Sequence, residues 1–221
     1  MKKIMTILFS TIFAVGIFAG CSGGTTNDTE DTKDSGTSQT ETGSDLLSAS
    51  YADIMKTGKY LMHYTIKTTV EGKTNVTDVI SAFDSNNKSY IFDTDSMKVH
   101  EIVKDKTVYV LNDDAKTYYK IVIDDTNSSG TTASVEDQKI DTSGIVYVGK
   151  GKAELNGKMM DYEEYKTDQG TLRYYFDGGK LYAIVFKSAE MESVMEIIEL
   201  SDNVTADMFE IPAGYTESTT Y

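Results

Sequence analysis

The chain has 221 residues, one Cys, one Pro, no Trp and a formal net charge of −14 at pH 7. Nucleic acid and anionic lipid both repel a strongly acidic surface, so the composition argues against either as a direct partner. A single Cys permits no internal disulfide, and any folded domain must be held together by burial and hydrogen bonding.

The first part of the chain has the organisation of an export signal. Lys2 and Lys3 give a positive start, and residues 4–18 form an apolar run interrupted only by small or hydroxyl-bearing residues. A run of this length with these flanks is too short for a lasting transmembrane helix. We therefore expect residues 1–20 to be a signal peptide.

Cys21 directly follows this segment, and its setting resembles the lipobox of bacterial lipoproteins, with Phe18 where that family usually has Leu. The resemblance implies diacylglycerol on Cys21, and two acyl chains give durable attachment. We expect a lipid anchor at the extracytoplasmic face of the cell membrane. Because almost all basic residues of the chain are lysines, the composition together with this leader favours a Gram-positive source. The alternative is a conventionally cleaved secreted protein with a stray thiol. Loss of the two leader lysines takes the net charge from −14 to −16.

The next segment is predicted to be a tether. Residues 22–44 contain no aliphatic or aromatic side chain and consist mainly of Thr, Ser, Gly and acids, so they cannot bury enough surface to offset the entropy of ordering. As a random coil this stretch reaches about 25 Å. We divide the chain after the leader into a lipidated tether at 21–44, a folded domain at 45–215 and a polar tail at 216–221. A domain of this size can bury enough surface to fold without disulfide bonds or bound metal.

The domain is predicted to open with a short helix. Ser44 or Asp45 can cap its start, and Gly58 can end it. Its buried side is marked by four apolar residues at helical spacing, namely Leu47, Tyr51, Ile54 and Met55.

After the helix the apolar period changes to two, which indicates strands. Asn-Gly, Asp-Gly and similar turn pairs recur at short intervals and accept the positive φ of tight hairpin turns. There is no room for the crossover helices of a parallel sheet, so we expect a mainly β (α+β) fold with one antiparallel meander of about eleven strands. The predicted strands are 59–70, 74–84, 88–93, 97–104, 106–112, 116–123, 144–155, 158–167, 171–177, 180–188 and 193–200.

One connection is much longer than the others. Residues 124–143 have little apolar content, and Ser134 to Asp137 could begin a brief helix within them. Loops of this length are usually functional or disordered.

The order of elements resembles a known group. A helix precedes a long first strand beginning at residues 58–62, a meander follows, and residues 208–215 (Met-Phe-Glu-Ile-Pro-Ala-Gly-Tyr) close the domain. This is similar to lipoproteins built on the fold of the outer-membrane lipoprotein carriers. The resemblance covers about 45–215 and implies a curved antiparallel half-barrel with helices against its concave side. It also implies that related proteins hold acyl chains or lipids in the concavity, or sense mislocalised lipoproteins; no functional residue is carried over from it.

Two strands are apolar on both faces, which is unusual for an antiparallel sheet. Residues 181–186 are entirely so and residues 172–176 nearly so, and both sides must therefore be covered. One interpretation is an ordinary core, and the other is an apolar pocket on the inner face. The candidate ligand-lining residues are Tyr60, Met62, Tyr64, Ile66, Leu172, Tyr174, Phe176, Tyr182, Ile184 and Phe186.

Metal binding and catalysis receive little support from the sequence. His63 and His100 are the only histidines and lie on different predicted strands, where lone histidines are mostly structural. No nucleophile elbow, phosphate loop or zinc-protease motif is present, so we expect neither an enzyme nor a cofactor.

Two functional hypotheses remain. The first is a non-catalytic module that binds a lipid, lipopeptide, acyl chain or apolar peptide in the concave face. The second is a regulatory lipoprotein that contacts an envelope protein through sheet edges and the 124–143 loop, with a solid concavity and no small ligand. A hydrolase would require a histidine or paired carboxylates converging in a cleft.

Overall fold

The computed structural model describes residues 46–95, 97–122 and 145–218. The predicted signal peptide, Cys21 and the tether lie outside the described residues. So does the 124–143 connection with its expected helix. Within the described part, no helix has the length and apolar character needed to cross a membrane.

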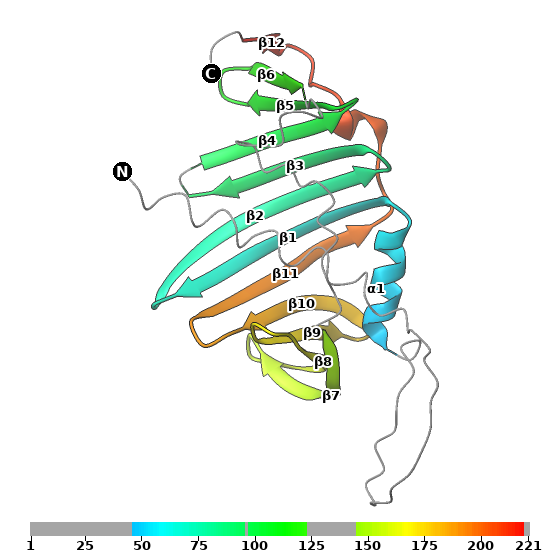
Figure 1. Cartoon of the computed structure of the whole chain (residues 1–221), viewed down its shortest axis with the longest axis vertical. Helices are drawn as coiled ribbons and strands as arrows, with labels where there is room; N and C mark the ends of the chain where they lie inside the picture. Colours follow the sequence, from blue (N-terminus) through cyan, green and yellow to red (C-terminus); the bar gives the residue numbers. More distant parts are fainter. Residues whose placement is uncertain (1–45, 96, 123–144, 219–221) are drawn as a thin grey trace, which may run out of the picture.

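Twelve strands form one sheet in the order β12-β6-β5-β4-β3-β2-β1-β11-β10-β9-β8-β7. The sheet is curved and does not close on itself (Figure 1). This confirms the predicted antiparallel half-barrel. The strands are β1 (Lys59–Val70), β2 (Lys73–Asp84), β3 (Asn87–Thr94), β4 (Met97–Lys104), β5 (Thr107–Asn112), β6 (Thr117–Val122), β7 (Val146–Leu155), β8 (Lys158–Lys166), β9 (Thr171–Asp177), β10 (Lys180–Lys187), β11 (Met191–Ser201) and β12 (Thr216–Glu217).

The twelfth strand was not expected from the sequence. β12 lies in the predicted polar tail and pairs with β6, and this pair is parallel whereas the others are antiparallel. It is attached because the backbone N–H of Thr216 donates to the carbonyl of Lys116, and that of Ser218 donates to the carbonyl of Tyr118. A two-residue strand carries no hydrophobic pattern that sequence reading could detect.

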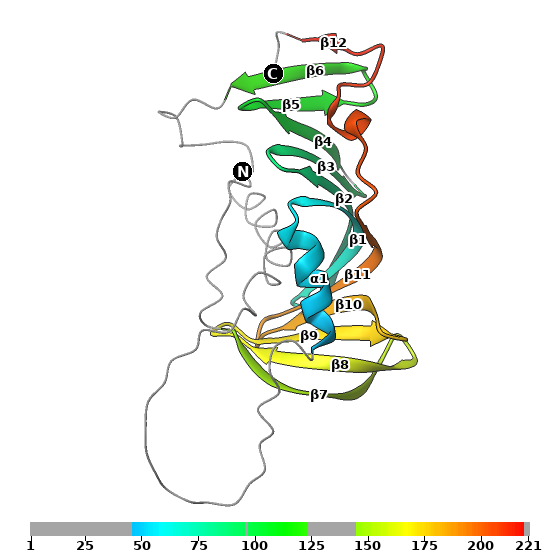
Figure 2. The ribbon, with the colours of Figure 1, turned by 90° about the vertical axis from the view of Figure 1, so that its right-hand side faces the viewer.

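Helix α1 (Leu47–Lys56) precedes β1 and lies against the concave side of the sheet (Figure 2). Its apolar side differs by one residue from the prediction, because Leu46 is 7% exposed whereas Leu47 is 41% exposed. The helix ends before Gly58, whose φ of 69° continues the chain into β1. We call the side of the sheet that carries α1 the concave face, and the opposite side the convex face.

Three bulges bend the sheet. The register shifts between His63 and Tyr64 in the β1–β11 pair, between Leu181 and Ala183 in β10–β9, and in β7–β8 between Tyr147 and Gly149. Each bulge adds a residue to one strand and increases the local twist and bend. The curvature of the half-barrel is therefore partly built into the register.

The convex face is covered in two places. At one end a short 3-10 helix, η4 (Ala206–Phe209), follows β11, and its segment buries Val204 and Phe209 against β2, β4 and β5. At the other end, Met160, Tyr175 and Ala183 are buried beneath the β7–β8 turn. That turn bends over the sheet, so the amide of its Asn156 donates to Tyr182 and Glu196 at 3.5 and 3.0 Å. Strand β10 is thus covered on both faces, as its apolar sequence requires.

Replacing Gly170 with Ala tests how closely the β8–β9 turn approaches β10. A Cβ atom at Gly170 would lie 2.3 Å from the backbone oxygen of Lys187. The added methyl group would push this oxygen away, and the oxygen cannot move without disturbing the β9–β10 ladder. We therefore expect the free energy of unfolding to fall by about 1–3 kcal/mol. Denaturant titration of the purified protein measures this change.

Gly149→Ala is the matched control, because no heavy atom lies within 4 Å of its added Cβ. We expect it to change the stability by less than about 0.5 kcal/mol. Equal losses for the two variants would show that the close approach at Gly170 is wrong.

Candidate functional site

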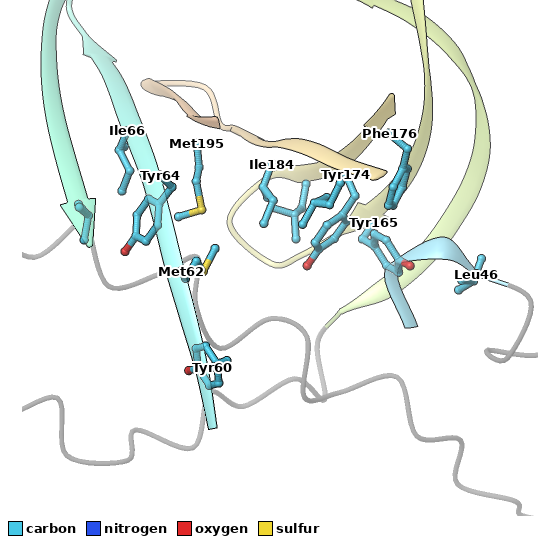
Figure 3. Packing of buried hydrophobic residues seen from close by; sticks show 13 residues of the cluster. Leu46, Tyr60, Met62, Tyr64, Ile66, Tyr165, Tyr174, Phe176, Ile184 and Met195 are labelled. Atoms are coloured by element: carbon cyan, nitrogen blue, oxygen red, sulfur yellow. The ribbon is translucent and has the colours of Figure 1, made fainter. Parts of the chain in front are cut away.

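The concave face is the candidate site, and most of the predicted ligand-lining residues meet there. Tyr60, Met62, Tyr64 and Ile66 point inward from β1, and they join side chains from β9 and β10 in one cluster (Figure 3). The sequence-predicted members of this cluster are Tyr60, Met62, Tyr64, Ile66, Leu172, Tyr174, Phe176 and Ile184, which are buried, and Phe186, which is partly buried.

Tyr182 is the exception, and its predicted place on the concave face is wrong. The bulge in β10 falls at this residue, so that Tyr182 and Ala183 both lie on the convex face. Leu181 takes the concave position instead and is 6% exposed. Strict period-two counting through β10 fails at the bulge because the extra residue reverses the phase of the alternation.

Much of this cluster is packed as a core. Met62 is 0% exposed and Phe176 is 1% exposed, and three side chains of α1 (Tyr51, Ile54 and Met55) pack against the cluster. The Tyr51 hydroxyl accepts a hydrogen bond from the backbone N–H of Leu181 at 2.6 Å. Beneath α1, therefore, the concavity is filled by the protein's own side chains.

A buried carboxylate holds the start of α1. Glu163 on β8 is 3% exposed, and its two oxygens accept the backbone N–H groups of Leu47 and Ser48 at 2.6 and 3.2 Å. Tyr165 donates to the same carboxylate at 3.3 Å and hydrogen-bonds Ser48 Oγ at 2.8 Å. The positive end of the helix dipole and three hydrogen-bond donors thus compensate the negative charge.

This arrangement replaces the cap predicted from the sequence. Ser44 or Asp45 was expected at the N-cap, but the N-cap residue is Leu46, which makes no side-chain cap hydrogen bond. The acceptor comes from Glu163, 116 residues further along the chain than Leu47. No local motif could reveal a cap supplied from that distance.

The concave face continues beyond α1 across β2 to β6. Directly opposed residues of neighbouring antiparallel strands share a face. The register therefore places Ser81, Tyr90, Glu101 and Val110 in one row with Met62. Among the described residues, no helix or strand lies over this outer part of the concave face (Figure 2).

An aromatic strip lies on this outer part. The rings of Tyr60 and Phe83 stack with centroids 4.5 Å apart, Phe83 meets Tyr90 edge-on at 5.6 Å, and Tyr90 lies 6.1 Å from Phe92. Burial is the main cause that raises the pKa of neighbouring Tyr64 to about 12, so its hydroxyl stays neutral at physiological pH. The sequence pattern assigned these strands correctly but gave no reason to single out Phe83, Tyr90 and Phe92.

The end of the concave face away from α1 has an apolar rim. Met97 on β4 and Val70 on β1 are 45% and 42% exposed. Met97 lies opposite Thr94, which continues the row of Ile66, and Val70 lies opposite the partly buried Met191. Methionine suits a surface that must adapt to differently shaped apolar partners.

Glu101 differs from every other side chain on the outer concave face. It lies on β4 between Tyr90 of β3 and Val110 of β5, with Val99 and Val103 two residues away on its own strand. Burial raises the pKa of its carboxyl group above the usual value. No hydrogen bond or ion pair joins Glu101 to another residue in the described part of the chain.

The two histidines lie on the convex face and do not meet. His63 Nε2 is 3.1 Å from Asp78, and His100 Nδ1 is 3.4 Å from Asp113. Burial alone would raise the pKa of Asp113, but hydrogen bonds from Tyr215 and the neighbouring cations lower it below its usual value. The contacts of Asp113 hold the C-terminal segment to the sheet beside an open depression of about 280 Å³.

The described residues contain no group of three or more His, Cys, Asp or Glu side chains arranged to hold a metal ion. Each imidazole ring thus has one aspartate partner, Asp78 for His63 and Asp113 for His100. These contacts place no histidine in the concave face.

No protein-family model and no curated protein matches the sequence. Solved structures do resemble the fold. Lipoprotein LppX of Mycobacterium tuberculosis is 14% identical, with 70% of this chain and 93% of that chain covered and a TM-score of 0.41. A LolA superfamily protein of Nitrosomonas europaea is 11% identical, with 70% and 94% covered and a TM-score of 0.36.

A third similar structure is the MucA/MucB complex of Pseudomonas aeruginosa. It is 10% identical, with 75% of this chain and 62% of that chain covered and a TM-score of 0.40. One of these structures, the LolA superfamily protein, comes from the carrier-like group that the order of elements in this sequence resembles.

Glu163→Gln tests the long-range cap. A carboxamide has one acceptor oxygen and turns its NH₂ toward one of the two helix N–H donors, so a buried donor loses its partner. We expect the free energy of unfolding to fall by about 1–3 kcal/mol. We also expect faster amide hydrogen exchange in α1 than in the central strands.

Glu154→Gln is the control, since Glu154 is exposed on the edge strand β7. Its expected effect is below about 0.5 kcal/mol. A Glu163→Gln protein as stable as this control, with unchanged exchange in α1, would refute the cap.

Proposed function

We propose that this chain is a membrane-tethered, extracytoplasmic binding protein without catalytic activity, whose outer concave face accepts an apolar chain of a lipid, lipopeptide or acyl group. The observation that carries the proposal is the apolar concave surface beyond α1, which ends in the exposed side chains of Val70 and Met97. A core has no need of an apolar rim at its open end, whereas an entering chain does.

The division of the concave face supports this function. α1 fills one part with Tyr51, Ile54 and Met55, and this fixes the shape of the sheet. The outer part offers the partly buried ring of Phe92, which packs beside the buried ring of Tyr90. Ligand sites are mostly apolar and preformed, with few polar groups, and this surface has that composition.

The anchor is part of the same proposal. Diacylglycerol on Cys21 and an acidic tether of about 25 Å would keep the domain close to the lipid surface from which a ligand comes. The net charge of −16 that follows from loss of the leader opposes direct contact with anionic headgroups. The domain would thus be held near the membrane by its lipid while its own surface stays off the bilayer.

A regulatory role with an envelope protein as partner is the second candidate. Its support is strand β7, an edge of the sheet with Val146 and Val148 61% and 57% exposed. Edge strands can pair with a segment of another protein. Glycines and the bulge at Tyr147 shape this edge in a way that also discourages such pairing, so we rank it second.

Met97→Asp tests the apolar rim. The full chain is expressed in a bacterium that processes lipoproteins, purified into lipid nanodiscs and irradiated with a photoreactive long-chain alcohol. Mass spectrometry then locates the labelled peptides. We expect labelling of β3 and β4 in the wild type and a loss of about tenfold in the variant, because a carboxylate in the rim must be desolvated against the chain.

Val76→Asp provides the matched control. Val76 is 44% exposed, close to the 45% of Met97, but it lies opposite Lys67 on the convex face. Its labelling should equal that of the wild type. Labelling spread over both faces, or equal losses in the two variants, would contradict a concave binding site.

Cys21→Ser tests the anchor separately. We expect the variant to leave the membrane fraction and to lose incorporation of radiolabelled palmitate, because the diacylglyceryl group needs the thiol. Fractionation of cells and labelling measure both outcomes. Unchanged membrane association without lipid incorporation would mean that the protein is held by another contact.

A further inference from the structure

Two carboxylates on the concave face have opposite surroundings. Glu163 is compensated by the N–H groups of α1 and by the hydroxyl of Tyr165. Glu101, on the outer part, has no donor or cation bonded to it among the described residues. The fold therefore compensates the charge of Glu163, whereas no described residue compensates that of Glu101.

Among the described residues, the neighbours of Glu101 do not bond to it. On the concave face Tyr90 and Val110 lie directly opposite it, and Val99 and Val103 flank it along β4. The charged residue nearest in register is Lys88 of β3, which lies opposite Val103 and forms no ion pair with Glu101. On the side of β5 the diagonal positions are Val108 and Asn112.

Such a carboxylate is costly. A partly desolvated charge without a partner destabilises the folded state, and burial raises the pKa of Glu101 for this reason. A Val or Thr at this position would suit the strand better. A charged residue that destabilises the folded state in this way, and that lies on a concave surface, is a candidate for ligand recognition.

The dimensions of the face relate Glu101 to the rim. Met97 lies four residues away on the same strand and the same face, which corresponds to about 13 Å. Phe92 and Tyr90 line the neighbouring strand along this path. An extended alkyl chain of about ten carbons can therefore join the carboxylate to the rim.

Resting on the proposed function, we propose that the outer concave face binds a cationic amphiphile, with its protonated amine beside Glu101 and its alkyl chain over Phe92 and Val99 toward Met97. The ammonium supplies the missing counter-charge. The chain covers the apolar strip. A carboxylate-headed lipid would instead bring a second negative charge to Glu101.

A competition experiment tests the headgroup. Full-length protein in zwitterionic nanodiscs is labelled with a photoreactive long-chain alcohol, and dodecylamine, dodecanol, dodecanoate or ethylamine is added as competitor. We expect dodecylamine to halve the labelling of β3 and β4 at about one tenth of the dodecanol concentration, as a charge-assisted hydrogen bond allows. Dodecanoate should compete less well than dodecanol.

Glu101→Gln keeps the shape of the side chain and removes the charge. We expect the amine and the alcohol to compete within about twofold of each other in this variant, while Glu154→Gln retains the wild-type ratio. Each ratio is measured in the same nanodiscs, so partition into lipid cancels between variants. Thermal unfolding checks that Glu101→Gln is folded, and the labelling by the alcohol shows that its apolar site is intact.

The pH dependence gives a second readout. The ammonium of dodecylamine stays protonated below pH 9, and Glu101 is the carboxyl group placed beside it. Lys88 and Tyr90 of β3 are the other titratable side chains that lie nearest in register on this face. The carboxyl of Glu101 ionises only above its raised pKa. The advantage of the amine should therefore grow as the pH rises from 4 to 8 and should be flat in Glu101→Gln.

The possible outcomes test the cationic headgroup, the alkyl chain and the proposed function separately. Equal competition by amine and alcohol in the wild type, or a preference for amine that survives Glu101→Gln, overturns the cationic headgroup and leaves apolar binding intact. Competition by ethylamine equal to that by dodecylamine overturns the amphiphile in favour of a simple amine. Absence of labelling in β3 and β4 by the alcohol overturns the proposed function itself.

Discussion

The hydrogen bonds between Glu163 and the first backbone N–H groups of α1 fix the arrangement on which the rest of the domain depends. They join β8, near one edge of the sheet, to a helix that leads directly into the central strand β1. Because the carboxylate is 3% exposed, its charge requires these donors, and the helix end requires an acceptor. The two needs are met together, and α1 is thereby held across the concave face.

The position of α1 divides the concave face into two regions with different roles. Under the helix, Met62 and Phe176 belong to a solid core. Beyond it, aromatic and aliphatic residues of β2 to β6 form a surface with one uncompensated acid, Glu101. An open half-barrel favours this division, because a sheet that does not close leaves part of its inner face uncovered by the sheet itself. Stability and binding can thus be assigned to different strands of the same sheet.

Sequence reasoning recovered β1 to β11 to within two residues at either end, because alternation and turn residues are local signals, and it missed only the two-residue β12. It also placed most of the inner-face residues of β1, β9 and β10 correctly. It failed at Tyr182, where a bulge reversed the phase of alternation, and at the helix cap, where the acceptor comes from a distant strand. Glu101 was missed for a related reason: its unusual character lies in neighbours supplied by β3 and β5, which become visible only when the strands are paired.

The attachment of α1 also determines how the domain would respond to mechanical tension. Residues 1–45 join the described domain at Leu46, immediately before the amides that Glu163 binds. A pull from that direction would act first on these hydrogen bonds and only afterwards on the ladder of β1, which is paired on both sides. The helix would therefore peel from its N-terminal end while the twelve-stranded sheet stayed intact, and the inner surface beneath it would become accessible in the same step.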